Sequence, residues 1–115
     1  MRKGGPLSGT PLPGRPVRGS DTGRPIMALL DLLGRRWTLR VLWELRDGPV
    51  PTFRDLQDRC GGLSSSVLAD RLTELREAGI VTSAGYDLTP SGRTLRHALR
   101  HLDAWAATWS PPTAG

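Results

Sequence analysis

The chain has 115 residues, of which 37% are hydrophobic, and this fits one domain with a modest core rather than two domains. No run of about 18 apolar residues is present, and Gly and Pro dominate the N-terminus where a signal peptide would be apolar, so we expect a cytoplasmic protein without a membrane span. The single Cys60 excludes an intramolecular disulfide; standing alone on an apolar stripe, it favours a buried small hydrophobe over a redox sensor.

The net charge of +5 is concentrated near the N-terminus. Residues 1–24 hold five basic residues and one acidic residue, so they carry +4 and leave residues 25–115 nearly neutral. The same segment contains six Gly and four Pro without helical or strand periodicity, which predicts a flexible basic arm. Such an arm is compatible with phosphate binding, and a solvated tail without a target is the alternative. Residues 25–110 are the predicted folded domain, and 111–115 a disordered tail.

Two helices are predicted before the centre of the chain. The first begins with Pro25 at position N1 and ends at Gly34, with one apolar stripe. The second follows Gly34 and is apolar on two sides, with Leu39 and Trp43 opposite the remaining large apolar residues. A helix that is apolar nearly all round is a buried helix, so we expect it to be covered on both sides.

Residues 52–79 predict two helices joined by a glycine turn, the proportions of a helix-turn-helix. Thr52 and Ser64 are the predicted N-caps, and Gly61-Gly62 ends the first helix. The second helix turns Leu68, Leu72 and Leu75 inward, and its outward residues are small and mostly polar: Ser65, Ser66, Ala69, Asp70 and Thr73. Such a face fits the major groove of DNA, although a Ser-rich first turn can also be only a good helix start.

The rest of the chain completes a winged helix. Residues 80–88 predict a small hairpin wing with a turn at Ala84-Gly85, and Thr89-Pro90 starts a helix of about twenty residues. That helix carries an apolar seam from Leu95 to Trp109, which predicts packing against another helix, for instance from a second copy. The predicted fold is mainly α with a small β-hairpin wing: a winged helix-turn-helix with flanking N- and C-terminal dimerisation helices.

These residues resemble the HxlR-type winged helix-turn-helix regulators of bacteria and archaea, relatives of the MarR group. The matching pieces span residues 26–109 and include Gly34-Arg35-Arg36-Trp37-Thr38-Leu39, Phe53-Arg54-Asp55-Leu56, Leu63-Ser64-Ser65-Ser66-Val67-Leu68 and Tyr86-Asp87-Leu88-Thr89-Pro90-Ser91-Gly92. The resemblance implies a homodimeric DNA-binding transcription regulator with its first and last helices at the dimer interface. The wing is shorter than in many members. Arg24-Pro25 stands where thiol-sensing members often have a cysteine, so thiol sensing is not carried over.

We therefore expect a sequence-specific regulator, a repressor, that binds an inverted-repeat operator as a homodimer. The predicted DNA-binding residues are Arg54, Ser64, Ser65, Ser66, Ala69, Asp70, Arg71 and Thr73. The predicted dimer-interface residues are Ile26, Leu29, Leu30, Leu33, Leu95, Leu99, Leu102, Trp105 and Trp109. For Arg71, binding to phosphate and pairing with an acid of the same domain are equally open. The alternative function is a winged-helix protein-interaction module that does not bind DNA specifically.

Other motifs predict little chemistry. His97 and His101 have a metal-compatible spacing but no evident third ligand, so exposed, unliganded histidines are favoured. The pair Glu74 and Glu77 is interpreted as solvated surface. No catalytic constellation is evident, so we expect no enzyme, cofactor or metal. The four tryptophans can line a pocket for a small-molecule effector of unknown identity, but core packing is the favoured interpretation.

Overall fold

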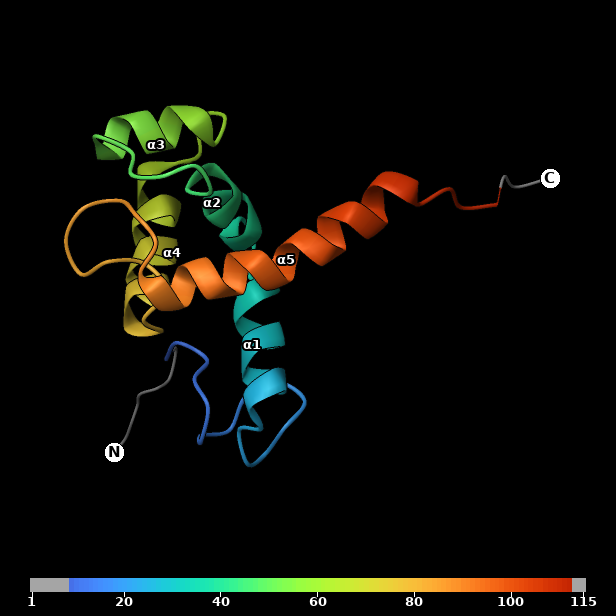
Figure 1. Cartoon of the computed structure of the whole chain (residues 1–115). Helices are drawn as coiled ribbons and strands as arrows, with labels where there is room; N and C mark the ends of the chain where they lie inside the picture. Colours follow the sequence, from blue (N-terminus) through green and yellow to red (C-terminus); the bar gives the residue numbers. More distant parts are fainter. Residues whose placement is uncertain (1–8, 113–115) are drawn as a thin grey trace.

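The computed structural model describes residues 9–112, and this range contains five helices (Figure 1). The helices are α1 (Pro25–Leu33), α2 (Thr38–Glu44), α3 (Phe53–Arg59), α4 (Ser65–Glu77) and α5 (Pro90–Thr108). Helix α2 contacts α1, α3 and α4, whereas α5 begins beside α4 and extends far beyond the other helices (Figure 1). The prediction of a mainly α fold is confirmed. No helix among the described residues is both long and apolar enough to cross a membrane.

The predicted helix starts are confirmed by side-chain caps. The hydroxyl of Thr52 accepts a hydrogen bond from the Asp55 amide (3.0 Å), and that of Ser64 accepts one from Val67 (3.3 Å). The hydroxyl of Thr89 accepts from the Gly92 amide (2.9 Å). Each cap satisfies one backbone amide that the first turn of a helix leaves without an internal partner, so local sequence alone sets where α3, α4 and α5 begin.

The inward leucines of α4 lie at the centre of the core. Leu68, Leu72 and Leu75 are at most 1% exposed, as the helical spacing predicted. They belong to one cluster of buried apolar side chains drawn from every helix except α5: Leu32, Val41, Leu42, Leu45, Val50, Leu56, Cys60, Leu63, Leu68, Leu72, Leu75, Ile80, Val81 and Leu88. Leu95 and Leu99 of α5 pack against this cluster from its edge. The core thus holds α4 by one face and leaves the other in solvent.

Helix α2 was predicted to be buried on both sides, but within the described residues it is buried on one side only. The face with Val41, Leu42 and Leu45 is buried, but Leu39 and Trp43 on the other face are exposed. Trp37, expected on the same side as Val41 and Leu42, precedes the helix with a left-handed φ of 75° and is exposed. Within residues 9–112, α5 lines a groove beside this second face but leaves Leu39 and Trp43 exposed.

The prediction that residues 80–88 form a hairpin of two strands is wrong. Among residues 9–112 no strand forms, and residues 80–88 contribute one isolated antiparallel bridge between Val81 and Leu88. Tyr86 pairs instead with Val50, whose amide donates to the Tyr86 carbonyl (2.9 Å). The guanidinium of Arg76 donates to the carbonyls of Thr82 (3.0 Å) and Gly85 (2.7 Å). A short loop fixed by an arginine therefore replaces the ladder that the alternating pattern suggested.

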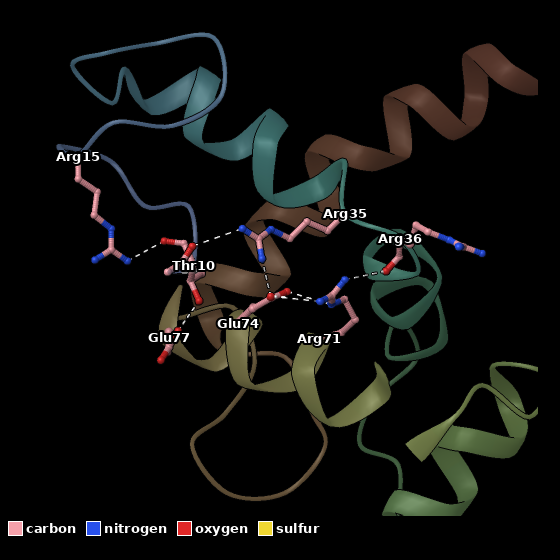
Figure 2. Close-up of polar contacts among 8 residues, drawn as sticks. Thr10, Arg15, Arg35, Arg36, Arg71, Glu74 and Glu77 are labelled. Carbon is pink, nitrogen blue, oxygen red and sulfur yellow. Dashed lines mark hydrogen bonds and ion pairs between the residues drawn. The ribbon is translucent and has the colours of Figure 1, made fainter. Parts of the chain in front are cut away.

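The described part of the predicted arm, residues 9–24, lies against α1 and the C-terminal end of α4 (Figure 2). Thr10 is buried, its hydroxyl donates to the Glu77 carboxylate, and its carbonyl accepts from Arg15 (2.6 Å). The hydroxyl of Ser20 accepts from the Arg24 amide (3.0 Å) just before α1. Of these contacts, only that between Thr10 and Glu77 joins residues far apart along the chain, 67 positions, and composition does not reveal it. The flexible arm stays a prediction. Residues 1–8, and 113–115 of the predicted tail, lie outside the described residues.

One carboxylate, that of Glu74 on α4, joins three segments (Figure 2). Arg35, between α1 and α2, donates to Glu74 Oε2 (2.6 Å) and also to the carbonyl of Gly9 (3.3 Å). Arg71 donates to the same oxygen (3.2 Å), and its Nε lies 3.0 Å from Glu74 Oε1 without hydrogen-bond alignment. The Glu74 side chain is only 12% exposed, so the interpretation as solvated surface is wrong. The network fixes the position of α4 relative to α1 and α2.

Replacement of Gly92 by alanine should destabilise the fold. A Cβ on Gly92 would lie 2.2 Å from the Ile80 carbonyl oxygen, which is itself held by the Thr89 amide (2.9 Å). Because backbone has to move, we expect Gly92→Ala to lower the free energy of unfolding by about 1–3 kcal/mol, measured by urea denaturation. Ser91→Ala, on an exposed neighbour in the same turn, is the control and should change stability little. Equal stability of the two variants would show that Gly92 does not lie this close to the Ile80 carbonyl.

Replacement of Glu74 by glutamine should loosen the junction of α1, α2 and α4. Arg35 and Arg71 would keep their partly buried charges without a counter-charge, so we expect a loss of roughly 1–3 kcal/mol in the free energy of unfolding. The matched control is Asp58→Asn, which breaks an exposed pair with Arg54 (3.9 Å) and should cost about 0–1 kcal/mol. Thermal unfolding at low and high salt measures both, and a Glu74→Gln effect no larger than the control would contradict the assignment.

Candidate nucleic-acid interface

Helix α4 presents the predicted small polar face to solvent. Its members Ser65, Ser66, Ala69, Asp70 and Thr73 are all exposed, while the leucines of the same helix are buried. Ser64 is also exposed, and its oxygen accepts from Val67 while its hydroxyl hydrogen is still available to another acceptor. The first turns of α4 therefore offer hydroxyl groups and little bulk, which allows the helix backbone to come close to base edges.

The turn before α4 depends on two glycines. Gly61 and Gly62 have φ values of 81° and 79°, a left-handed conformation that residues with a Cβ rarely adopt. Gln57 at the end of α3 donates to the Leu63 carbonyl (2.7 Å), which ties the two helices together across the turn. This turn sets the angle at which α4 leaves α3, so it positions the outward face.

The two arginines predicted at the interface have different surroundings. The Arg54 side chain is 83% exposed and its nearest carboxylate oxygen, on Asp58, is 3.9 Å away, so it is available to a phosphate. The Arg71 side chain is 17% exposed, pairs with Glu74 and donates to the Arg36 carbonyl (3.3 Å). Of the two roles left open for Arg71, the structure shows the pairing with an acid of the same domain.

Arg36 is a further candidate, which no sequence pattern indicated. Arg36 lines a surface hollow together with Gly61, Gly62 and Ser64 at the start of α4. Its side chain points away from the Glu74 cluster (Figure 2). A helix N-terminus favours anions, and an arginine beside it adds a charge that can bind phosphate. Only the packing of the α1–α2 connection against α4 brings Arg36 to this place, and no local pattern indicates it.

Cys60 closes the core next to the turn. It is 2% exposed, which confirms its interpretation as a buried small hydrophobe. Burial raises the pKa of the Cys60 thiol, nearby Glu44 raises it further, and Arg40 acts in the opposite direction. The thiol therefore stays protonated at neutral pH, and its reactive thiolate form is disfavoured.

The predicted dimer-interface residues fall into two groups. Leu29, Leu33, Leu95 and Leu99 are partly buried in their own chain. The exposed ones are Ile26, Leu30, Leu102, Trp105 and Trp109. Trp37 and Trp43 are exposed as well, so core packing of the four tryptophans is wrong for the described chain. Trp105 and Trp109 stack on each other with ring centroids 5.4 Å apart.

No cluster of three potential metal ligands occurs within residues 9–112. His97 and His101 are both exposed on α5. The interface is thus built from hydroxyls, a turn and arginines, and these groups suit recognition rather than catalysis.

Comparisons with known proteins agree with this geometry. The HxlR-like helix-turn-helix family model matches residues 32–114. The HTH-type transcriptional regulator YodB of Bacillus subtilis is 31% identical over 90 residues, which cover 70% of this chain and 80% of YodB. The uncharacterized HTH-type transcriptional regulator YvaP of the same organism is 29% identical over 93 residues, covering 73% and 85% of the two chains.

Solved structures of YodB share the fold. The crystal structure of quinone-bound YodB superposes with a TM-score of 0.66 at 30% identity, covering 73% of this chain and 97% of that one. The reduced form of YodB gives a TM-score of 0.64 at 30% identity, covering 78% and 97%. The chain therefore belongs to the HxlR-like helix-turn-helix family, and it is a transcriptional regulator rather than an enzyme.

Proposed function

We propose that this regulator binds an inverted-repeat operator as a homodimer, with α4 of each subunit in the major groove. The observation that carries this proposal is the outward face of α4, which is small, mostly polar and exposed on a helix held from behind by buried leucines. In helix-turn-helix proteins the second helix of the motif reads base edges, and two-fold symmetry of the dimer matches symmetry of the operator. Repression is the simplest outcome, because a dimer bound over a promoter blocks access to it.

Phosphate contacts are assigned to arginines around α4. Arg54 at the start of α3 and Arg36 beside the start of α4 are exposed, and Arg36 lines a hollow with the turn residues Gly61 and Gly62. Arg18 and Arg24 of the N-terminal segment are exposed too, although Asp31 lies 3.9 Å from Arg18. Phosphate contacts supply affinity and register without reading sequence. We therefore assign specificity to α4 and general affinity to these arginines.

A small-molecule effector is part of the proposal, because the relative YodB has been solved with a bound quinone. Quinones add to thiolates, and the only thiol here, Cys60, is buried with a raised pKa. We propose that any effector of this chain binds without forming a covalent bond.

Separate variants should alter specificity and general affinity. Ser65→Ala with Ser66→Ala removes hydroxyls from the outward face of α4. We expect specific binding to lose about 1–3 kcal/mol relative to non-specific binding for each base that a serine reads, which lowers the ratio of specific to non-specific affinity. Arg18→Ala with Arg24→Ala removes four charges from the dimer. With fewer phosphates neutralised, the salt slope of log affinity should fall by up to about 3.6, and that ratio should stay nearly unchanged.

Fluorescence anisotropy with the promoters of its own and adjacent genes measures both effects over a salt series. A wild-type chain that shows no preference for any of these promoters over random duplex at about 100 mM salt would overturn the proposal and favour a protein-interaction module.

The thiol should stay unmodified in the folded protein. After exposure to a benzoquinone at neutral pH, we expect the intact mass to be unchanged, because a buried thiol with a raised pKa reacts slowly. The control is the same protein unfolded in urea, where Cys60 is accessible and should gain one adduct. Rapid adduct formation in the folded protein would contradict the non-covalent assignment.

A further inference from the structure

Trp37 is the one residue other than glycine with a left-handed φ among residues 9–112, and the proposed function leaves it without a role. Its φ of 75° costs free energy for a residue with a Cβ, and Gly or Asn adopts this conformation most readily. Residues in such a conformation persist where the surrounding structure holds them, and they cluster at functional sites. A tryptophan at this position therefore needs a reason that its side chain supplies.

The backbone at the start of α2 does not require a tryptophan. The Trp37 carbonyl accepts from the Val41 amide (2.9 Å), and the Thr38 amide donates to the Arg35 carbonyl (3.2 Å). Both hydrogen bonds join main-chain atoms, so they do not depend on which side chain residue 37 carries. The Trp37 side chain is 39% exposed, so part of its surface is not used for packing.

The Trp37 side chain lies at the hollow beside the start of α4. This hollow has a volume of about 520 Å³, and its wall combines Trp37 with Arg36 and with the turn that leads into α4 at Gly61, Gly62 and Ser64. The Arg36 side chain points away from the Glu74 cluster (Figure 2). One aromatic and one cationic side chain therefore stand next to each other where α4 begins.

The other three tryptophans have partners that Trp37 lacks. The guanidinium of Arg46 lies over the Trp43 ring, 4.1 Å from its centroid, and Trp105 and Trp109 stack on each other. In the part of the chain that the structure describes, Trp37 pairs with no aromatic ring and no guanidinium. The exposed part of its ring is therefore available to a molecule that enters the hollow.

The chemistry of the hollow matches a sugar-phosphate unit of DNA. The indole Nε1–H donates and cannot accept, which suits a phosphate oxygen, and the ring offers an apolar surface to a deoxyribose. Arg36 adds a positive charge, which strengthens a hydrogen bond to phosphate. With α4 in the major groove, the strand that borders the groove passes close to the start of that helix.

We propose that Trp37 binds the DNA backbone at the edge of the major groove, with Nε1 donating to a phosphate and the ring lying on the adjoining deoxyribose. Arg36 binds a phosphate of the same strand. The left-handed φ of Trp37 aims the indole at the hollow, which accounts for the strain. This inference rests on the DNA binding of the proposed function, and it adds a residue that contributes affinity without charge.

Trp37→Phe keeps an aromatic ring and removes the donor. We expect the affinity for promoter DNA and for random duplex to fall alike, by about tenfold or more, because a hydrogen bond to a charged group is lost and no base is read. The salt slope of log affinity should stay unchanged, since tryptophan carries no charge. Arg36→Gln should instead lower the slope of a dimer by about 1.8. Fluorescence anisotropy over a salt series measures both quantities.

Trp43→Phe is the matched control, because it makes the same change at the exposed tryptophan within α2. This variant should keep the wild-type affinity and the wild-type salt slope. A Trp37→Phe chain that binds both duplexes as tightly as wild type would overturn the inference. A changed salt slope in Trp37→Phe would overturn it as well, because the substitution would then act through a neighbouring arginine.

The indole N–H signals of the ¹⁵N-labelled wild-type chain test the contact without relying on the folding of a variant. The chain has four tryptophans, and the signal missing from the spectrum of Trp37→Phe identifies that of Trp37. On titration with a random duplex at low salt, the Trp37 signal should move further than those of the other three, because its N–H gains a phosphate acceptor. A Trp37 signal that stays in place while the chain binds the duplex would overturn the inference.

Wild-type binding separates this inference from the proposed function. A wild-type chain that binds neither promoter DNA nor random duplex would overturn DNA recognition and this contact with it. A wild-type chain that binds DNA while Trp37→Phe binds equally well would overturn the contact alone.

Discussion

The Glu74 carboxylate is the contact on which the placement of the recognition helix depends. The buried leucines of α4 hold that helix against the core, but apolar contacts alone do not fix its rotation and position to the degree that directed ionic hydrogen bonds do. Glu74 adds direction, because Arg35 from the α1–α2 connection and Arg71 from α4 converge on it. Arg35 extends the link to Gly9, so the N-terminal segment is joined to the same point.

The sequence predicted the features that depend on neighbours within one or two helical turns. The caps at Thr52, Ser64 and Thr89, and the buried and exposed faces of α4, follow from local hydrogen bonding and helical period, and the structure has them as predicted. The candidate reading face on α4 was therefore accessible from sequence. Its operator contacts remain a proposal.

Contacts between residues far apart in the chain could not be predicted from the sequence. Glu74 was misinterpreted because Arg35 lies 39 residues away, and Arg36 was missed because only tertiary packing brings it to the start of α4. The prediction of a two-stranded wing was wrong for a related reason. Alternation at residues 80–88 suggested a ladder, yet the Val50 amide donates to the Tyr86 carbonyl and Arg76 donates to two carbonyls of the loop. The tryptophans were misplaced because helical spacing marks an apolar face without showing whether another element covers it, and all four are exposed in the described chain.

The separation of the two faces of α4 has a consequence for how such regulators diversify. The five positions assigned to base reading are exposed, and the leucines that hold α4 in the core lie on its opposite, buried face. Substitutions on the outward face are therefore almost neutral for folding, so a duplicated copy can drift to a new operator without passing through unfolded intermediates. For the same reason, a library of variants at these five positions is a practical way to redirect the protein to a new operator while the rest of the fold stays unchanged.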